Sequence, residues 1–328
     1  MFLNSPDPSL ATNLRRLSLL MQKWPGRALN LDATVKALNY EAPAVPVFWC
    51  FNEMSEYESL GRVMCPQHPL VGMRSLNLVM KVTASTAPLL DALAAHYAEV
   101  LISQFGRRTC IVGGNCQAAS IAWRVAMRLL IAGVPVLRLV TLDAELRVPY
   151  PGHMRLLFGA ESHLYNPFLS AAADPQRPIP WHWERAWRGV DWRFIPGPHG
   201  NYFASQNISF VAQGILEDHS EPVFDPLAVN VEPAWVSAGG ARGEMLIEAP
   251  ASEELARRQD LAVLPIWQTA QGGLIQVKSP DWIVPLGSGE VLRCCLRVPE
   301  DAVPARVLPI LCQKGRGPLI WPGALSIS

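Results

Sequence analysis

The sequence predicts an α/β protein, with a mostly parallel sheet covered by helices on both faces, followed by a β-rich C-terminal domain. Short apolar runs alternate with segments of helical periodicity over residues 45–221, which is typical of a buried parallel sheet. Beyond residue 222, short β-type runs replace this alternation and turn signals such as Gly287-Ser288-Gly289 recur. That texture indicates an antiparallel sandwich. We therefore expect a helical extension over 1–44, an α/β domain over 45–221 and a β domain over 222–328.

The individual elements follow from local patterns. Leu10, Leu14, Leu17 and Met21 recur at helical spacing and predict an N-terminal helix over 8–24, ended near Pro25-Gly26. Further helices are expected over 87–105, 118–132 and 207–216. Core strands are expected over 45–52, 68–73, 109–112, 134–142, 154–158 and 192–195. In the C-terminal domain, strands are expected over 244–247, 261–267, 273–277, 283–285, 291–298 and 306–312.

Composition narrows the class of protein. The chain has 328 residues, of which 50% are hydrophobic, and 28 basic residues balance 28 acidic ones. This balance gives no electrostatic case for nucleic acid or for an anionic membrane. No apolar run is long enough for a membrane span, and the start of the chain does not have the pattern of a signal peptide. The seven cysteines lack CxxC spacing, which argues against a zinc site or a disulfide framework and fits a reducing cytoplasm.

The stretch Cys110-Ile-Val-Gly-Gly-Asn-Cys116-Gln-Ala-Ala119 is the most informative motif. It predicts a strand, a sharp turn with Cys116 at its apex, and a helix. This is the layout of a nucleophile elbow, G-x-S-x-G, with cysteine in place of serine and Ala118 in place of the second glycine. An isolated cysteine is more often a small core residue. The small residues on both sides favour the elbow, because a strand and a helix pack closely there.

Two later residues are candidate partners for Cys116. In the elbow-containing α/β-hydrolase fold the acid follows the nucleophile in the chain and the histidine comes last. Asp143 directly follows an apolar strand, although an aspartate in this position could equally cap a turn or helix. His199 lies in the loop Ile195-Pro-Gly-Pro-His199, between a strand and a helix. The other six histidines either precede the elbow or lack this setting: His68, His96, His153, His163, His182 and His219.

These residues define an expected reaction. His199 would take a proton from Cys116 or hold the thiol as an ion pair, and Asp143 would fix the imidazole tautomer. The backbone N–H of Gln117 would stabilise the oxyanion. A second N–H is expected from the loop after the first core strand, around Asn52 and Glu53.

The motifs together resemble the thioesterase domains of nonribosomal peptide and polyketide synthases, which have the α/β-hydrolase fold. The matching stretches are Pro46–Cys50, His68–Gly72, Leu93–Tyr97, Val112–Ala119, Ala126–Gly133, Leu139–Asp143 and Ile195–His199. By position, the resemblance assigns Cys116 as nucleophile, Asp143 as acid and His199 as base. It implies an acyl thioester substrate on the phosphopantetheine of an acyl or peptidyl carrier protein, with no cofactor held by this chain.

The departures from the family pattern carry information. Phe51-Asn52-Glu53 replaces the usual His-Gly after the first core strand. The family's lid of helices is expected to be deleted, because only about ten residues separate Asp143 from Met154. Serine is the family's usual nucleophile. A thioester on Cys116 would keep more of the acyl group's activation than an oxygen ester, which favours acyl transfer or cyclisation over hydrolysis. The N-terminal helix after Met1 favours a free-standing protein over an excised domain.

Two other functions remain open from the sequence. The altered oxyanion loop and the missing lid favour a catalytically inactive docking module, whereas the order Cys116, Asp143, His199 disfavours it. A free-standing esterase with a sugar-binding β domain is the other alternative. Its aromatic surface would be formed by Trp181, Trp183, Trp187 and Trp192, although tryptophans at this spacing more often pack in a core.

Overall fold

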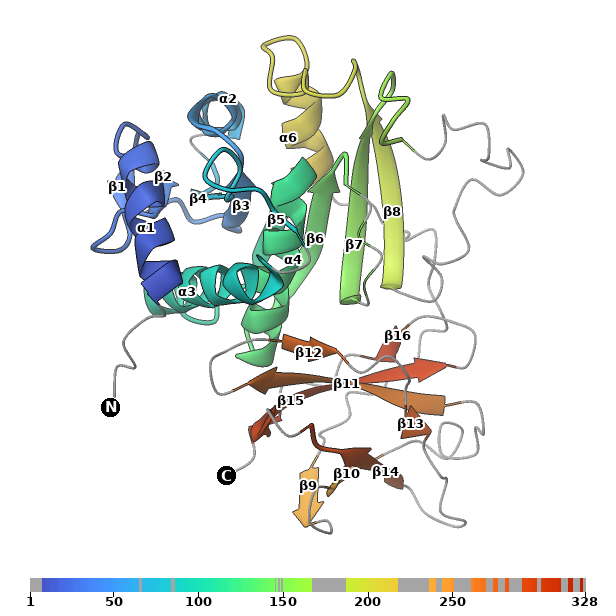
Figure 1. Ribbon diagram of the computed structural model, residues 1–328. Helices are drawn as coiled ribbons and strands as arrows, with labels where there is room; N and C mark the ends of the chain where they lie inside the picture. The colour runs from blue at the N-terminus through green and yellow to red at the C-terminus, as the bar shows by residue number, and fades with distance from the viewer. Residues whose placement is uncertain are drawn as a thin grey trace.

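An eight-stranded sheet forms the centre of the α/β part (Figure 1). The computed structural model describes residues 8–64, 67–83, 86–144, 146, 148, 150–166, 187–217, 236–239, 244–250, 261–269, 274–276, 281–282, 291–299, 302–313, 318–320 and 325–326. The strands are β1 (Arg27–Ala28), β2 (Val35–Leu38), β3 (Val47–Phe51), β4 (Leu70–Arg74), β5 (Cys110–Asn115), β6 (Val136–Leu142), β7 (Tyr150–Gly159) and β8 (Trp187–Ile195). Their order in the sheet is β1-β2-β4-β3-β5-β6-β7-β8.

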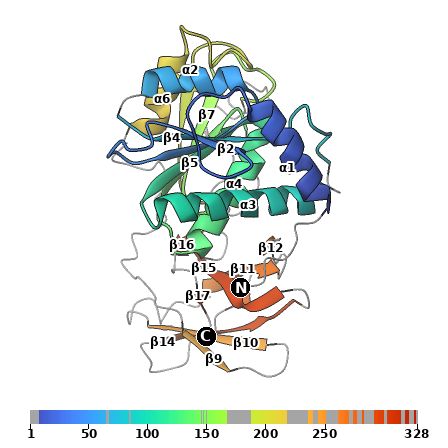
Figure 2. The same cartoon turned by 90° about the vertical axis from the view of Figure 1, so that its left-hand side faces the viewer.

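Helices cover both faces of this sheet (Figure 2). On one face lie α1 (Pro8–Met21), α3 (Ala87–Phe105) and α4 (Ala119–Ile131). On the other face lie α2 (Met54–Met64) and α6 (Ile208–Leu216). The strands from β3 to β8 pair in parallel, and β2 pairs antiparallel with β4 and β1. The predicted mostly parallel sheet with two helical layers is confirmed.

Strand β3 shows why these residues form such a sheet. All five of its residues are buried. Phe48 and Cys50 pack into the core beneath α3 and α4, whereas Val47, Trp49 and Phe51 pack into the core beneath α2 and α6. Because side chains alternate between the two faces of a strand, an uninterrupted apolar run requires cover on both sides.

The chain reverses its direction of winding between β3 and β5. From β3 it passes through α2 to β4 on one side, and it then returns through α3 to β5 on the other side of β3. Ligands of open α/β sheets bind at such a switch point, outside the carboxyl ends of the strands. Asn52 follows β3 and Cys116 follows β5, so both lie at this point of the sheet.

The N-terminal region differs from the expected helical extension over 1–44. Residues 27–38 contribute β1 and β2 to the sheet, and α1 packs on α3. These strands have two and four residues, too few for a clear period-two signal. Helix α2 was not predicted either, although Tyr57, Leu60 and Met64 are buried at helical spacing. The domain boundaries at 44/45 and 221/222 stay predictions.

The described C-terminal strands pair antiparallel. They are β9 (Val236–Gly239), β10 (Glu244–Pro250), β11 (Leu261–Thr269), β12 (Leu274–Gln276), β13 (Asp281–Trp282), β14 (Val291–Arg297), β15 (Ala302–Gln313), β16 (Pro318–Ile320) and β17 (Leu325–Ser326). One sheet has the order β14-β10-β9, and another runs β12-β11-β15-β16, with β13 on β11 and β17 on β15. Strand β16 contacts β7 and β8. A sandwich arrangement of these sheets stays a prediction.

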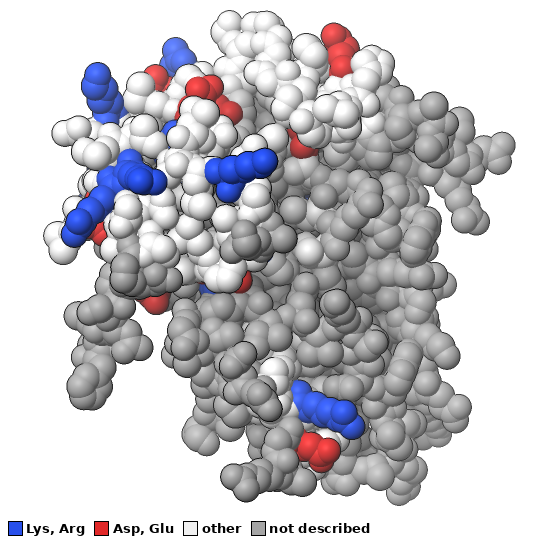
Figure 3. Space-filling model, in the orientation of Figure 1, with Lys and Arg blue, Asp and Glu red and all other residues white. Residues whose placement is uncertain are grey.

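Charged side chains of both signs are interspersed on the described surface. In Figure 3 most of the described Lys and Arg side chains on that face stand over α1, β1, β2 and α2, with Asp and Glu among them. Arg27 and Glu41 form one exposed ion pair, with 3.4 Å between Nη1 and Oε1. Within the described residues, no helix combines the length and apolar character needed to cross a membrane.

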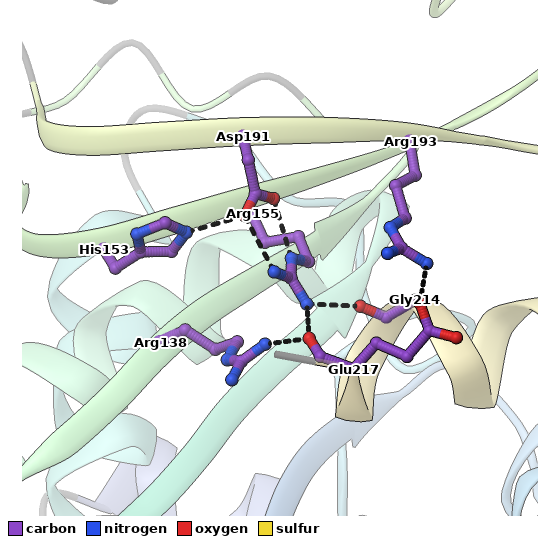
Figure 4. Close-up of polar contacts among 7 residues, drawn as sticks. All are labelled: Arg138, His153, Arg155, Asp191, Arg193, Gly214 and Glu217. Atoms are coloured by element: carbon purple, nitrogen blue, oxygen red, sulfur yellow. Dashed lines mark hydrogen bonds and ion pairs between the residues drawn. The ribbon is translucent and has the colours of Figure 1, made fainter. Parts of the chain in front are cut away.

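A buried ionic network fixes α6 against β7 and β8 (Figure 4). The Arg155 guanidinium is 1% exposed and donates to both carboxylate oxygens of Asp191, at 2.7 and 2.8 Å. Arg155 and Arg138 also donate to the carbonyl of Glu217, just beyond the last residue of α6. Cations at a helix C-terminus satisfy carbonyls that have no partner within the helix. The loop that carries His199 joins β8 to α6, so this network holds together the two elements between which that loop runs.

Asp191 is expected to contribute stability that disappears in acid. Burial alone would raise the pKa of Asp191, but hydrogen bonds from His153 and Arg155 hold it well below its usual value. A carboxyl whose folded-state pKa is lowered stabilises the fold above its unfolded pKa, and this contribution disappears as the pH falls below about 4. Asp191→Asn should lower the free energy of unfolding at pH 7 by about 3–5 kcal/mol, measured by denaturant titration.

The same titrations in acid give the check. The difference in unfolding free energy between the wild type and Asp191→Asn should narrow as the pH falls below about 4. Asp32→Asn, which neutralises an exposed carboxylate, serves as the control and should change little. A pH-independent difference would show that the charge of Asp191 is not the stabilising element.

Candidate active site

Cys116 lies at the apex of a strained turn between β5 and α4. Its φ is 50°, a value that residues other than glycine seldom adopt. A single 3-10 turn, Cys116–Ala118, follows and leads into α4. The layout of strand, turn and helix predicted from the sequence is therefore present. The thiol stands above the carboxyl edge of the sheet and is partly exposed.

The two glycines before Cys116 are required by close packing. A Cβ at Gly114 would lie 2.9 Å from the carbonyl oxygen of Ala118 and 3.1 Å from the Cβ of Ala122. A Cβ at Gly113 would collide with the indole of Trp49. Glycine at position 114 lets α4 start directly over β5, so that the chain turns sharply at Cys116, while glycine at position 113 makes room for Trp49 on the other face of the strand.

Asp143 holds the centre of a dense hydrogen-bond cluster. It follows β6 with a φ of 49° and is 2% exposed. Its Oδ1 accepts the backbone N–H of Gly159 at 2.9 Å, and its Oδ2 accepts Ser162 Oγ at 2.7 Å. The same Oδ2 contacts His199 Nδ1 at 2.8 Å and accepts the hydroxyl of Tyr202. The carboxylate thus orients the imidazole of His199, in addition to accepting the bonds expected of an aspartate that caps a turn.

Tyr202 was not singled out from the sequence, although it stands three residues after His199. Burial and the hydrogen bond to Asp143 raise the pKa of Tyr202, so its hydroxyl remains a donor. A Cβ at Gly159 would overlap that hydroxyl. Gly159 is therefore the residue that makes room for the contact, and only the folded arrangement of β7 and the His199 loop reveals it.

His199 is 38% exposed and stacks on Tyr165, with 4.2 Å between ring centroids. Among the described residues, no hydrogen bond is recorded between His199 and Cys116. Catalytic hydrogen bonds in ligand-free sites are often long and tighten only when substrate binds. The structure therefore joins two of the three predicted residues directly and places Cys116 beside Asp143.

A cavity of about 810 Å³ opens at Cys116. Its wall has apolar side chains and a few polar ones: Asn77, Met80, Lys81, Val82, Cys116, Gln117, Ser120, Asp143, Ala144, Leu146, Leu164 and Tyr165. The volume suits a ligand of drug-like size. Strand β6 ends at Leu142 and β7 begins at Tyr150, and the deletion of the lid stays a prediction.

The thiol of Cys116 is held in its protonated form. Burial raises its pKa, the N–H of Gln117 acts in the opposite direction, and the negative charges of Asp143 and Glu56 raise it further. Because the thiolate is the nucleophile, reaction at neutral pH requires a base to remove the proton. This favours proton transfer to His199 over a standing ion pair.

The predicted oxyanion loop is held by Glu56. The backbone N–H of Asn52 donates to Glu56 Oε2 at 2.7 Å, and that of Glu53 donates to the same oxygen at 3.3 Å. The Asn52 side chain donates to the carbonyl of Asn115 at 3.2 Å. Gln117 lines the cavity, and the role of its N–H at an oxyanion stays a prediction. In the described residues no group of three or more His, Cys, Asp or Glu side chains is arranged as a metal site.

Comparison with known proteins gives a likeness only at the level of structure. No family model and no curated protein matches the sequence. Similar solved structures include the NocB thioesterase domain from the nocardicin cluster, at 15% identity and a TM-score of 0.43, covering 56% of this chain and 97% of that one. Another is the surfactin-cyclising thioesterase domain SrfTE, at 12% identity and a TM-score of 0.40, covering 57% and 94%. At these values the roles of the site residues rest on geometry alone.

The contact between Tyr202 and Asp143 can be tested by removing it from either side. Tyr202→Phe deletes a hydrogen bond to a charged group and should lower the free energy of unfolding by about 1.5–3 kcal/mol, measured by denaturant titration. Gly159→Ala should displace the same hydroxyl. If both act through one contact, the double variant will be less destabilised than the sum of the single ones. Strict additivity would contradict this interpretation.

Proposed function

We propose that the chain is a thioesterase or acyltransferase of natural-product biosynthesis, acting through an acyl-Cys116 intermediate. The observation that carries this proposal is the placement of Cys116 on a positive-φ turn, beside a cavity that also contains Asp143, while Asp143 holds His199 through Nδ1. The motif resemblance of residues 45–220 to synthase thioesterase domains supports an acyl thioester on a carrier protein as substrate. No cofactor is needed for this chemistry.

The first half-reaction moves the acyl group onto sulfur. His199 Nε2 takes the proton of Cys116, and the thiolate attacks the thioester carbonyl. The Gln117 N–H stabilises the oxyanion, and we assign the second donor to Glu53, whose bond to Glu56 is the longer of the two. The oxyanion collapses, the bond to the pantetheine sulfur breaks, and His199 returns the proton to that leaving thiolate.

The second half-reaction moves the acyl group to an acceptor. His199 removes a proton from water, an amine or an internal hydroxyl, and this acceptor attacks the acyl-Cys carbonyl. Collapse of the second oxyanion releases the product, and His199 restores the proton to Cys116. Because the acyl-Cys bond is a thioester, it remains activated towards amines and weak hydroxyl nucleophiles. We therefore propose transfer or cyclisation as the favoured outcome.

A docking module without activity is the second candidate. Two observations favour it: Glu56 accepts both loop N–H groups, and within the described residues His199 makes no hydrogen bond to Cys116. The sugar-binding esterase is not favoured, because Trp192, one of its four tryptophans, packs against the hydrophobic core; Trp181 and Trp183 lie outside the described residues. Acylation of Cys116 separates an enzyme from a docking module.

Incubation with acyl-pantetheine thioesters should add one acyl mass to Cys116. Intact-mass spectrometry would show the adduct, and peptide mapping would place it. Cys116→Ala should abolish it, and His199→Ala should slow its formation at pH 7 by about 10²- to 10⁴-fold, because proton removal is then left to water. Cys295→Ala, which removes an exposed cysteine, is the control and should leave the adduct unchanged. Absence of any adduct across a broad acyl panel would favour the docking module.

The role of sulfur can be read from the products. With both an amine and water as acceptors, Cys116→Ser should shift the product ratio towards the hydrolysed acid, because an oxygen ester is less activated towards the amine. Liquid chromatography of the two products gives the ratio. An unchanged ratio would mean that the acceptor is chosen by the cavity and not by the nucleophile.

A further inference from the structure

Glu56 connects the two turns that form the candidate active site. It stands in the first turn of α2 and is partly buried. Its Oε1 accepts the side-chain N–H of Asn115 at 2.8 Å, and its Oε2 accepts the backbone N–H groups of Asn52 and Glu53. Asn115 immediately precedes Cys116, and the loop of Asn52 and Glu53 follows β3. One carboxylate thus joins the ends of β3 and β5 at the switch point.

Further hydrogen bonds make this junction rigid. Asn115 Oδ1 accepts the indole N–H of the fully buried Trp49 at 3.2 Å. The Asn52 side chain spans between the carbonyl of Asn115 and Ser75 Oγ, which donates to it at 2.7 Å. Both side-chain amides therefore have fixed orientations. The amide N–H of Asn115 donates to Glu56, and that of Asn52 donates to the carbonyl of Asn115.

Burial and hydrogen bonding act in opposite directions on the carboxyl group of Glu56. Burial is the larger effect and raises its pKa above the usual value, the hydrogen bonds from Asn52, Asn115 and Glu53 lower it, and the negative charge of Glu53 raises it further. Arg74, Cys50 and Cys116 are the other titratable groups that Glu56 acts on. All three hydrogen-bonding groups that reach Glu56 are donors, an arrangement that favours the carboxylate form, whose oxygens only accept. A partly buried carboxyl with a perturbed pKa beside a candidate nucleophile is a feature of functional sites.

We infer that Glu56 is a positioning residue, which ties Asn115, the residue before the nucleophile, to the loop of Asn52 and Glu53. It thereby fixes the position of the Cys116 thiol relative to the backbone N–H groups of that loop. This inference rests on the proposed function, in which Cys116 is acylated. Glu56 acts through Asn115, Asn52 and Glu53 and touches no reacting atom. Its helix supplies the residue by the capping arrangement in which a glutamate in the first turn accepts the N–H groups that precede the helix.

The variant Glu56→Gln separates positioning from folding. It keeps the shape of the side chain, but its amide presents a donor to at least one of the three donors. Acylation of Cys116 by an acyl-pantetheine thioester should slow by about tenfold or more, since a misplacement near 1 Å is costly in rate. Loss of the negative charge should at the same time lower the pKa of Cys116. Alkylation by iodoacetamide, followed on the Cys116 peptide by mass spectrometry, should then reach half its maximal rate at a lower pH.

Two more variants isolate the charge and the reach of the side chain. Glu56→Asp keeps the charge but shortens the side chain, so acylation should slow while the pH midpoint of alkylation stays close to that of the wild type. Glu58→Gln makes the same charge change two residues along α2 and is the matched control, with both readouts unchanged. Thermal melts of all variants show whether each one is folded.

The outcomes distinguish this inference from the proposed function. If the wild type is not acylated, the proposed function fails, and the alkylation profile still reports the contact between Glu56 and the turn. If Glu56→Gln is acylated at the wild-type rate, the positioning role is overturned. It is also overturned if acylation and alkylation fall together with the melting temperature, because that pattern indicates only a general loss of structure.

Discussion

Strand β5 is packed so closely on both of its faces that a Cβ at Gly114 would overlap Ala118 and Ala122 at the start of α4, and a Cβ at Gly113 would overlap Trp49 of β3. This packing decides the rest of the site. With no room to bend gradually, the chain reverses within one residue, and Cys116 takes a positive φ. Trp49 fills the space left at Gly113 and binds Asn115 through its indole N–H. The nucleophile turn is therefore set by packing in the core.

Charge is distributed unevenly around this turn. Asp143 accepts four hydrogen bonds and Glu56 accepts three. Asp143 follows β6 and Glu56 lies in the helix after β3, and these two strands flank β5, which leads to Cys116. Both carboxylates raise the pKa of the thiol. The site thus opposes spontaneous ionisation of Cys116, and in the proposed function its reactivity depends on His199. A buried thiol that ionises only when a base is in place is protected from unwanted alkylation and oxidation.

The sequence predicted the parts of the molecule in which one local pattern has one structural meaning. The helix over 87–105, the strands of the parallel sheet and the turn at Cys116 follow from periodicity and small residues. The pairing of Asp143 with His199 follows from chain order. Glu56, Tyr202 and Gly159 could not be found in this way, because each matters only through a neighbour brought close by the fold. Strands β1 and β2 are too short to carry a periodic signal.

The backbone at Cys116 also limits which nucleophiles this turn can carry. A side chain branched at Cβ is strongly disfavoured at positive φ, so threonine is excluded. Cysteine and serine differ only in the atom at the γ position, sulfur or oxygen, and both place that atom in the same direction. The scaffold therefore allows an exchange of sulfur and oxygen without any rearrangement of the fold. Under the proposed function, one substitution would exchange an ester for a thioester intermediate, while Asp143, His199 and the cavity remain in place.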